Sequence, residues 1–326
     1  MSITRASFLA AAAAGIAVGV PRLGRAAAPQ TLSLDYAYYN PPSLILKQNG
    51  WLEAALAKSG TSVNWVLSLG SNKANSFLAA NAVQFGSTAG SAALLARANG
   101  NPIKTVYLFS RPEWTALVIG KASPLASVRD LKGKKIAATR GTDPWFFLLR
   151  ALRANGLDAG DVEIVDLQHP DGRLALERGQ VDAWAGLDPH MAASQLDAGS
   201  RLLYRNVNFN TFGALNARED FLAAQPDVVA IVLQQYERAR KYAIAQPGDA
   251  AKALADASHL EDRVAQVEIR DRTTYPDPVP GKAYADAIAG VVPIITAENL
   301  VAAGTDIAAA AQTLLDPQPV RAALRA

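Results

Sequence analysis

Short apolar segments that suit β-strands alternate with segments that suit helices through the first two thirds of this 326-residue chain. That alternation is typical of a parallel sheet, in which each strand is followed by a crossover helix. It therefore predicts an α/β fold made of two such units. The first unit is expected to have strands at 31–36, 62–66 and 82–85, and helices at 43–50, 74–80 and 91–98. The second is expected to have strands at 134–139, 162–166 and 181–185, and helices at 144–155, 172–178 and 189–198.

Beyond about residue 217 the pattern turns helical, with helices expected at 227–245 and 248–257 before a proline-rich break at 275–280. Two apolar segments, 114–119 and 211–216, could run between the two units. Two crossing strands would form a hinge. No repeat with a period of 20–50 residues is evident, which argues against a solenoid.

Residues 1–26 have the make-up of a secretory signal peptide, with a basic start and an apolar run at 8–20. The small residues Gly24 and Ala26 precede the expected cleavage site, and the sequence leaves open export by the general or the twin-arginine route. No later segment has the roughly 18 uninterrupted apolar residues of a membrane-spanning helix. The signal's only charged residues are three arginines, so they account for the formal net charge of +3. The charge therefore gives no support to nucleic-acid binding.

The chain has no cysteine, which excludes disulfides, thiolate metal sites and thiol nucleophiles. A lipid-anchored exported protein needs a cysteine at its cleavage site, so we expect free diffusion in a bacterial periplasm. The three histidines, His169, His190 and His259, lack metal-ligand spacing, and no metal or cofactor is expected. Phosphate-binding P-loops and nucleophile-elbow motifs are also missing. These observations favour binding over catalysis.

Residues 131–152 predict a short strand, a glycine turn and a helix whose first turn is open to an anion. Free backbone N–H groups and the helix dipole make such a junction positive. Asp143 and Pro144 form a strong helix start, since aspartate caps well and proline suits the first helical position. A carboxylate there would compete with an anionic ligand, which makes Thr142 the better candidate contact. Asp143 either caps the helix or meets a cationic amine on a zwitterionic ligand.

A second junction of this kind lies at residues 86–90, which follow a predicted strand and open a helix. Ser87 and Thr88 can offer hydroxyl and backbone N–H groups to an anionic oxygen there. Simple helix capping is the alternative role for both residues.

Four segments together resemble one family, the exported substrate-binding proteins of ABC importers for aliphatic sulfonates, taurine and nitrate. These segments lie at 85–90, 125–138, 141–142 with 148–152, and 179–189, in the family's order, within a match that covers about residues 31–216. The resemblance implies a type II periplasmic-binding-protein fold with a ligand cleft between two lobes. Lobe 1 would comprise residues 27–113 and 217–326, and lobe 2 residues 114–216.

The resemblance also implies further cleft residues. The loop after the first strand would supply polar edges and aromatic walls, although its side chains could equally be surface residues; they are Tyr38, Tyr39 and Asn40. Trp145 and Trp184 could line the cleft or the core, and Asp188 could contact ligand or cap a helix. Leu187 stands where the family commonly has an aromatic residue, which changes the shape expected of the pocket.

We therefore expect a monomeric, non-enzymatic carrier that captures a small organic anion by hinge closure and delivers it to a membrane permease. The aromatic residues favour an organic group, and hence an aliphatic sulfonate over nitrate. Thiamine pyrimidines and other small solutes are the alternatives within transport. An exported enzyme on the same fold and a periplasmic sensor module are the alternatives from other classes.

Overall fold

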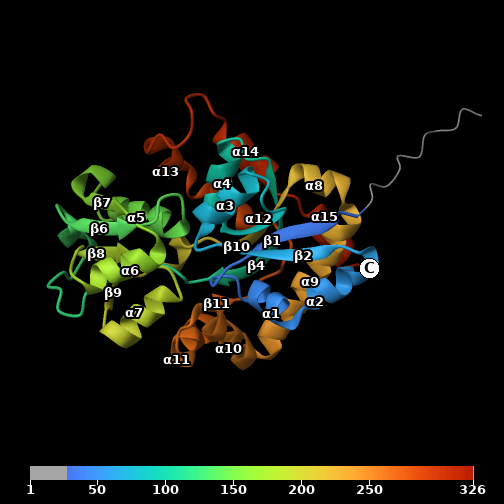
Figure 1. Cartoon of the computed structure of the whole chain (residues 1–326). Coiled ribbons are helices and arrows are strands. Elements are labelled where there is room, and N and C mark those ends of the chain that lie inside the picture. Colours follow the sequence, from blue (N-terminus) through green and yellow to red (C-terminus); the bar gives the residue numbers. More distant parts are fainter. Residues whose placement is uncertain (1–27, 326) are drawn as a thin grey trace, which may run out of the picture.

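The computed structural model describes residues 28–325, which form two lobes, each built around its own β-sheet (Figure 1). The predicted signal peptide, residues 1–26, lies outside the described residues. Six strands form the sheet of lobe 1: β1 (Thr31–Tyr36), β2 (Ser62–Leu67), β3 (Phe85–Ala89), β4 (Ile103–Pro112), β10 (Gly213–Arg218) and β11 (Thr273–Thr274). Their order is β11-β4-β10-β3-β1-β2, with β1 parallel to β2 and β3, and β10 antiparallel to β3 and β4.

Lobe 2 holds the second sheet, in the order β7-β6-β8-β5-β9. Its strands are β5 (Leu117–Ile119), β6 (Lys135–Ala138), β7 (Glu163–Asp166), β8 (Ala183–Ala185) and β9 (Arg201–Tyr204). Strand β6 runs parallel to β7 and β8, whereas β5 is antiparallel to β8 and β9. The predicted two-lobed α/β fold is therefore confirmed.

Helices connect the strands in both lobes. Those before the second crossing are α1 (Pro41–Asn49), α2 (Trp51–Leu56), α3 (Ser71–Ala79), α4 (Gly90–Ala98), α5 (Asp143–Ala154), α6 (His169–Glu177) and α7 (His190–Ala198). The chain after β10 is mostly helical, as expected: α8 (Glu219–Ala224), α9 (Pro226–Ala245), α10 (Pro247–Ser258), α11 (Asp262–Gln266), a π-helical turn η5 (Val267–Asp271), α12 (Lys282–Ala289), α13 (Val292–Ala297), α14 (Ile307–Leu314) and α15 (Gln318–Ala323). Short 3₁₀ turns lie at Ala57–Ser59, Val128–Leu131, Ala159–Asp161 and Val207–Phe209.

Local sequence explains the first of these elements. Strand β1 alternates, and its inward residues Leu32 and Leu34 are fully buried. Asn40 then accepts a hydrogen bond from the Ser43 N–H, and two prolines follow it at the start of α1. Gly50 ends α1 in the left-handed conformation, with φ of 61°, which glycine adopts at little cost.

Strand β3 lies further along the chain than the sequence pattern predicted, at residues 85–89 instead of 82–85. Its residues after Phe85 are small and partly polar, a composition that resembles a loop. All five are buried because the strand lies between β1 and β10 in the sheet. A Cβ at Gly86 would come within 2.7 Å of the Leu78 side chain, so helix α3 packs against this strand too closely for a larger residue.

The chain crosses between the lobes twice, at residues 113–116 after β4 and at 205–212 after β9. The second crossing ends earlier than expected. Residues 213–216, which the sequence placed in lobe 2, belong to β10 and pair with β3 and β4 in the lobe 1 sheet. Their apolar pattern suits either lobe, and only the strand pairing decides between them.

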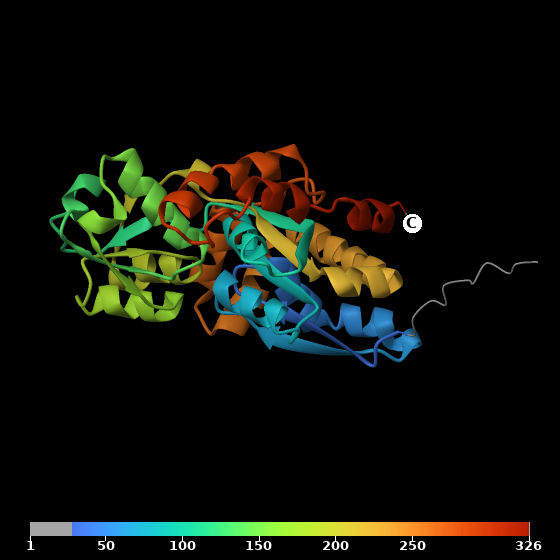
Figure 2. The same ribbon diagram turned by 90° about the horizontal axis from the view of Figure 1, so that it is seen from above.

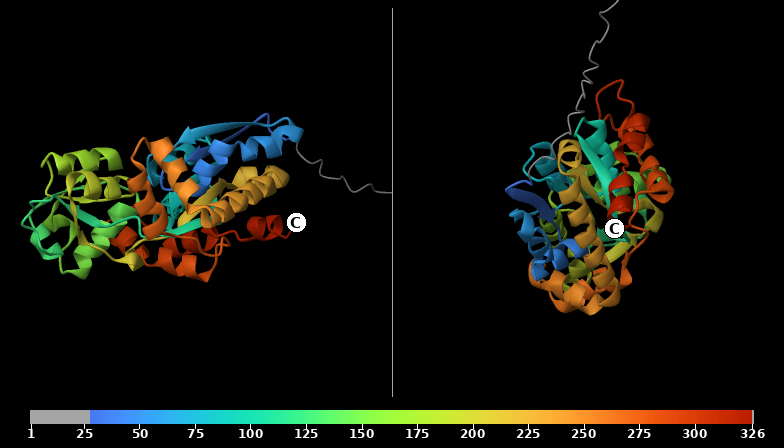
Figure 3. Two further views of the ribbon diagram at one scale, coloured as in Figure 1. Left: turned by 90° about the horizontal axis from the view of Figure 1, so that it is seen from below. Right: turned by 90° about the vertical axis from the view of Figure 1, so that its right-hand side faces the viewer.

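The helical tail belongs to lobe 1 but also contacts lobe 2. Helix α11 packs against α7 at the boundary between the lobes (Figure 3), where Arg263 pairs with Asp197 at 2.6 Å. On another side, Arg153 of α5 pairs with Glu298 after α13, also at 2.6 Å. Helix α15 lies at the end of lobe 1 that is farthest from lobe 2 (Figure 2). Within residues 28–325, no helix has both the length and the apolar content needed to cross a membrane.

Candidate functional site

A small cavity lies where the two lobes meet. It leaves about 10 Å³ for the centre of a water-sized sphere, which is room for roughly one water molecule. Lobe 1, the first crossing and lobe 2 all contribute to its wall: Tyr39, Ser71, Ala89, Trp114, Thr142, Asp143, Pro144, His169 and Leu187. The lobes are therefore in contact around this space.

Four helices begin at this cavity. Ser71 and His169 are the first residues of α3 and α6, while Ala89 and Thr142 immediately precede α4 and α5. Each helix start carries partial positive charge, but the first N–H groups of α4 are already engaged, Gly90 with the Phe212 carbonyl at 3.0 Å and Ser91 with Thr211 Oγ1 at 3.3 Å. No lysine or arginine is among the lining residues, so positive charge reaches the wall from the helix ends and from the guanidinium groups of Arg111 and Arg150, which lie near Asp143. Two of these helices come from each lobe, an arrangement suited to hold an anion between them.

The Asp143 carboxylate is buried, and both of its oxygens accept hydrogen bonds from outside α5. Oδ1 accepts from Ser91 Oγ at 2.5 Å and from Thr211 Oγ1 at 2.9 Å. Oδ2 accepts from Trp114 Nε1 at 2.9 Å and from the Thr211 N–H at 2.7 Å. Asp143 does not cap α5, since Thr142 occupies the cap position. Its carboxylate instead connects lobe 2 to the first turn of α4 and to both crossings.

Thr142 lines the cavity, but its hydroxyl donates to the Thr139 carbonyl at 2.6 Å. Its oxygen remains able to accept a hydrogen bond. An anion at this position would therefore be bound by the backbone at the start of α5 and not by the Thr142 hydroxyl proton.

Ser87 and Thr88 lie within β3 and not at the end of a strand, and neither lines the cavity. Ser87 Oγ donates to Asp35 Oδ1 at 2.8 Å and accepts from Asn40 Nδ2 at 2.6 Å. Thr88 Oγ1 accepts from Asn216 Nδ2 at 2.7 Å. Burial raises the pKa of Asp35 to about 7, and its hydrogen bonds with Ser87 partly oppose this rise. These side chains form a polar network inside lobe 1, behind the cavity wall.

In the first loop, only Tyr39 reaches the cavity. Its hydroxyl donates to the Ser87 carbonyl at 3.0 Å, and its ring meets Trp114 edge-on, with ring centres 5.9 Å apart. Asn40 caps α1 and joins the Ser87 network. Tyr38 instead approaches His190 of lobe 2, with ring centres 6.4 Å apart.

The remaining predicted residues lie outside the cavity wall. Trp145 is buried in an apolar cluster to which both lobes contribute, and Trp184 in a smaller core of lobe 2; the indole N–H of each has no hydrogen-bond partner among the described residues. Pro189, not Asp188, occupies the cap position of α7, although Asp188 Oδ1 accepts a hydrogen bond from the Ala192 N–H at 2.9 Å. Its main partner is Arg272, at 2.9 Å.

Three residues of the wall that the sequence did not single out are Ser71, Trp114 and His169. Ser71 Oγ accepts from the Ala89 N–H at 2.9 Å and so connects the starts of α3 and α4. His169 is followed by a proline at the start of a helix, the same signal that marked Asp143 and Pro144. That pattern could have identified His169, whereas its spacing from the other histidines gives no sign of a metal site.

His169 is fully buried, and its neighbours indicate which ring nitrogen carries the proton. The Thr139 hydroxyl donates to the Leu167 carbonyl at 2.6 Å and lies 3.1 Å from His169 Nδ1. Because that hydroxyl proton is already used, its oxygen accepts from Nδ1–H. Nε2 then carries a lone pair and has no partner among the described residues. Burial lowers the pKa of His169 to about 3, with a further contribution from His190.

This buried neutral imidazole predicts a pH-dependent loss of stability. Below about pH 6.5 the unfolded chain binds a proton at His169, whereas the folded protein stays neutral there until about pH 3. Stability is therefore lost as pH falls. Between about pH 7.5 and pH 5, the ligand-free wild type should lose about 2 kcal/mol more unfolding free energy than His169→Gln. Urea denaturation at each pH measures this difference. As a control, His259→Gln, which changes an exposed histidine, should behave as wild type. Parallel pH curves for wild type and His169→Gln would contradict the prediction.

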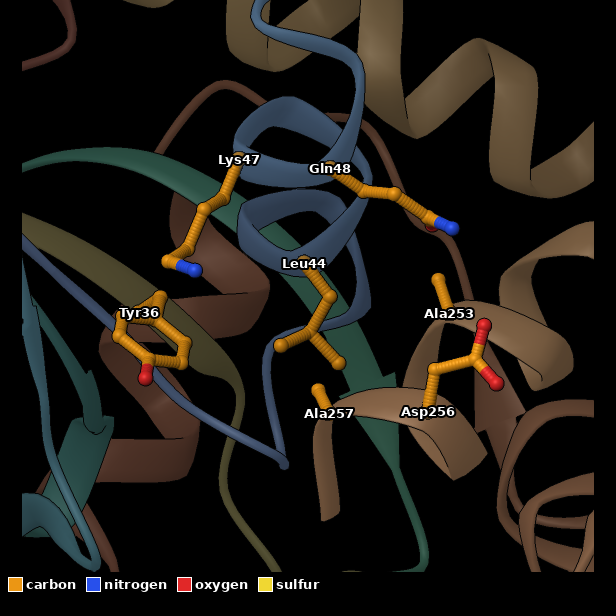
Figure 4. Close-up of a pocket in the computed structure, with 7 residues that line it drawn as sticks. All are labelled: Tyr36, Leu44, Lys47, Gln48, Ala253, Asp256 and Ala257. Atoms are coloured by element: carbon orange, nitrogen blue, oxygen red, sulfur yellow. The ribbon is translucent and has the colours of Figure 1, made fainter. Parts of the chain in front are cut away.

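A second pocket, of about 230 Å³, lies on lobe 1 between α1 and α10 (Figure 4). Leu44 lies at its centre, with Lys47 close to the Tyr36 ring on one side and Asp256 on the other. It contains no lobe 2 residue, so it is separate from the space between the lobes. Among residues 28–325, no group of three histidine, aspartate or glutamate side chains is placed to hold a metal ion.

Comparisons with known proteins show what this chain resembles. Two curated relatives are provisionally named aliphatic sulfonates-binding proteins. The one from Escherichia coli (strain K12) is 30% identical over 61% of this chain and 60% of its own length. The one from Bacillus subtilis (strain 168) is 29% identical over 69% of each chain. The match thus spans less than two thirds of the first relative's length.

A solved structure shows the same fold over nearly its whole length. The alkanesulfonate-binding protein from Xanthomonas axonopodis pv. citri, bound to MOPS, superposes with a TM-score of 0.79 at 26% identity, covering 87% of this chain and 99% of that one. The family model described as NMT1/THI5 like matches residues 44–250, which is more than half of the chain. The resemblance noted in the sequence is confirmed, and the chain belongs to the NMT1/THI5-like family.

Proposed function

We propose that this chain is the solute-binding component of an ABC importer, that it acts in the periplasm as a monomer, and that it captures a small organic anion. An aliphatic sulfonate is the preferred class. The observation that carries the proposal is the convergence of four helix starts, two from each lobe, on one cavity. The names of the curated relatives and of the solved structure support the sulfonate.

Binding would require the lobes to separate. A cavity with room for about one water molecule cannot hold an organic sulfonate with the lobes in their present contact. Residues 113–116 and 205–212 are the natural hinge, because they alone carry the chain between the two sheets. The lobes would then close on the ligand, with helix N-termini facing its anionic group and Tyr39 and Trp114 beside its organic part.

Of the ligand contacts predicted from sequence, we propose Tyr39, Thr142 and Asp143 as residues that face the ligand. The negative charge of Asp143 is offset by its four hydrogen-bond donors and by the nearby guanidinium groups of Arg111 and Arg150. The other predicted contacts are not part of the cavity wall; they are Tyr38, Asn40, Ser87, Thr88, Trp145, Trp184 and Asp188.

A carrier role fits the wall better than catalysis. A hydrolytic site needs a nucleophile that is hydrogen-bonded to its base. Within the described part of the chain, His169 Nε2 has no hydroxyl partner, while Ser71 Oγ and Thr142 Oγ1 are engaged with the backbone. The protein should therefore release its ligand unchanged to a permease.

Isothermal titration calorimetry on the chain without residues 1–26 tests this function. A simple sulfonate such as ethanesulfonate or 2-aminoethanesulfonate should bind one to one and raise the melting temperature, since ligands that bind only the folded state stabilise it. Nitrate and a thiamine pyrimidine are the comparison ligands. Binding of either without any sulfonate would overturn the sulfonate assignment, and conversion of a bound sulfonate, seen by NMR, would overturn the carrier role.

A further inference from the structure

The starts of helices α3 and α6 face each other across the boundary between the lobes. Helix α3 begins at Ser71 in lobe 1, directly after Gly70, and α6 begins at His169 in lobe 2. A Cβ built on Gly70 would lie 3.1 Å from His169 Nε2. The imidazole therefore reaches from lobe 2 to the entry of a lobe 1 helix.

Two hydrogen-bond acceptors that have no donor among residues 28–325 lie close to this place. His169 Nε2 is one, and Asn72 Oδ1, which is 2.8 Å from the same Cβ position, is the other. Both atoms are buried, and a buried acceptor without a donor costs free energy. An ordinary structural histidine would be paired at both nitrogens. Here Nδ1 is held by Thr139, and Nε2 is left facing the cavity region.

The hydrogen bonds around His169 determine what could pair with it. Thr139 accepts from Nδ1–H, so Nε2 offers a lone pair and no proton. A sulfonate oxygen also offers only lone pairs and cannot satisfy Nε2. A ligand group with an N–H or O–H can do so, while the helix starts hold its anionic end.

We propose that His169 Nε2 accepts a hydrogen bond from an amino or hydroxyl group of the bound ligand, and that His169 is a specificity-determining residue. This rests on the proposed function and narrows its ligand class to sulfonates that carry an N–H or O–H donor close to the sulfonate. Gly70 contributes because it has no side chain to cover Nε2: a Cβ there would lie only 3.1 Å from Nε2 and 2.8 Å from Asn72 Oδ1.

The test compares three sulfonates of nearly equal size by calorimetry: ethanesulfonate, 2-hydroxyethanesulfonate and 2-aminoethanesulfonate. Wild-type protein should bind each of the two donor-bearing ligands about tenfold more tightly than ethanesulfonate, the effect of one added hydrogen bond. In His169→Leu the ratio should fall to about one, mainly through weaker binding of the donor-bearing ligands. His169→Gln should keep much of the preference, because its amide oxygen can reach the position of Nε2.

Two further variants test whether a lost preference in His169→Leu comes from the missing imidazole or from a damaged fold. Gly70→Ala keeps the imidazole, and Gly70 has an extended backbone that alanine can adopt, yet the added Cβ would lie 3.1 Å from His169 Nε2 and cover that atom. It should therefore also abolish the preference. His190→Gln, which changes a half-buried histidine outside the cavity wall, should leave the preference unchanged.

The outcomes separate this inference from the function on which it rests. Equal affinity of wild type for all three sulfonates, or an unchanged ratio in folded His169→Leu, would overturn the role of His169 while leaving a sulfonate carrier intact. No binding of any sulfonate by wild type would instead overturn the proposed function. The ¹⁵N NMR signal of His169 Nε2 in wild type gives a readout independent of any variant, since it should shift with 2-hydroxyethanesulfonate and not with ethanesulfonate.

Discussion

Replacing Asp143 by alanine should lower the unfolding free energy by about 3–5 kcal/mol, because the change leaves several buried donors without an acceptor. The donors are the Trp114 indole N–H, the Thr211 N–H and the hydroxyls of Ser91 and Thr211. They belong to both crossings and to the start of α4. The variant should thus be less stable, and its two lobes should be held together less tightly. Urea denaturation followed by circular dichroism measures the loss.

Two companion variants identify the cause. Asp143→Asn keeps the shape but turns an N–H₂ group toward donors, so it should lose nearly as much stability as alanine. Asp286→Ala removes a carboxylate from an exposed pair with Lys282 and should cost less than about 1 kcal/mol. If Asp143→Ala cost no more than this surface control, the four hydrogen bonds would not carry the connection between the lobes.

Formate offers a direct test of the missing group, since it is the carboxylate that the alanine substitution removes. Formate should raise the melting temperature of Asp143→Ala more than that of wild type, by binding the donors that Asp143 normally occupies. An equal response of both proteins would mean that the donors have found other partners.

Replacing Arg272 by methionine should cost a similar amount, about 3–5 kcal/mol, because it leaves a buried carboxylate without its cation. Arg272 Nη1 lies 2.9 and 3.0 Å from the two oxygens of Asp188, which is fully buried. Arg272 follows η5 in lobe 1 and Asp188 precedes α7 in lobe 2, so the pair joins the lobes. Burial raises the pKa of neighbouring Glu268 well above its usual value, and the Asp188 charge adds to this effect.

A double variant separates charge from packing. Adding Asp188→Asn to Arg272→Met removes the stranded charge, so the double variant should be more stable than Arg272→Met alone. Lys282→Ala, which breaks an exposed pair with Asp286, should have little effect. Additive losses at Arg272 and Asp188 would show that the two side chains do not stabilise each other.

Much of the fold could be predicted because its signals are local. The apolar alternation of β1, the proline starts of α5 and α6, and the long helices of the tail each follow from neighbouring residues. The position of strand β3 could not be predicted correctly, because its small residues do not look like a strand in sequence. They are small because the strand packs closely against Leu78 and lies in the middle of the sheet. Neither is visible in a window of sequence.

The site residues, too, could be predicted only where the signal is local. The start of α5 was recognised as a junction at the cleft, and Thr142 and Asp143 do line the cavity. The sequence could not show that Asp143 is occupied by Ser91, Trp114 and Thr211, since these partners are 29 to 68 residues away along the chain. For the same reason it could not separate Tyr39, in the wall, from Asn40, behind it.

By itself, therefore, the sequence determined the two-lobed α/β fold, the family and the helix starts suited to an anion, because strand and helix periods and capping residues act over short distances. Only the tertiary structure decided which side chains remain free to meet a ligand. Hydrogen bonds between distant segments engage Ser87, Thr88 and Asp143, whereas no donor in the described part of the chain reaches His169 Nε2. A polar residue's availability depends on its neighbours in space, and these are set by the packing of the two lobes.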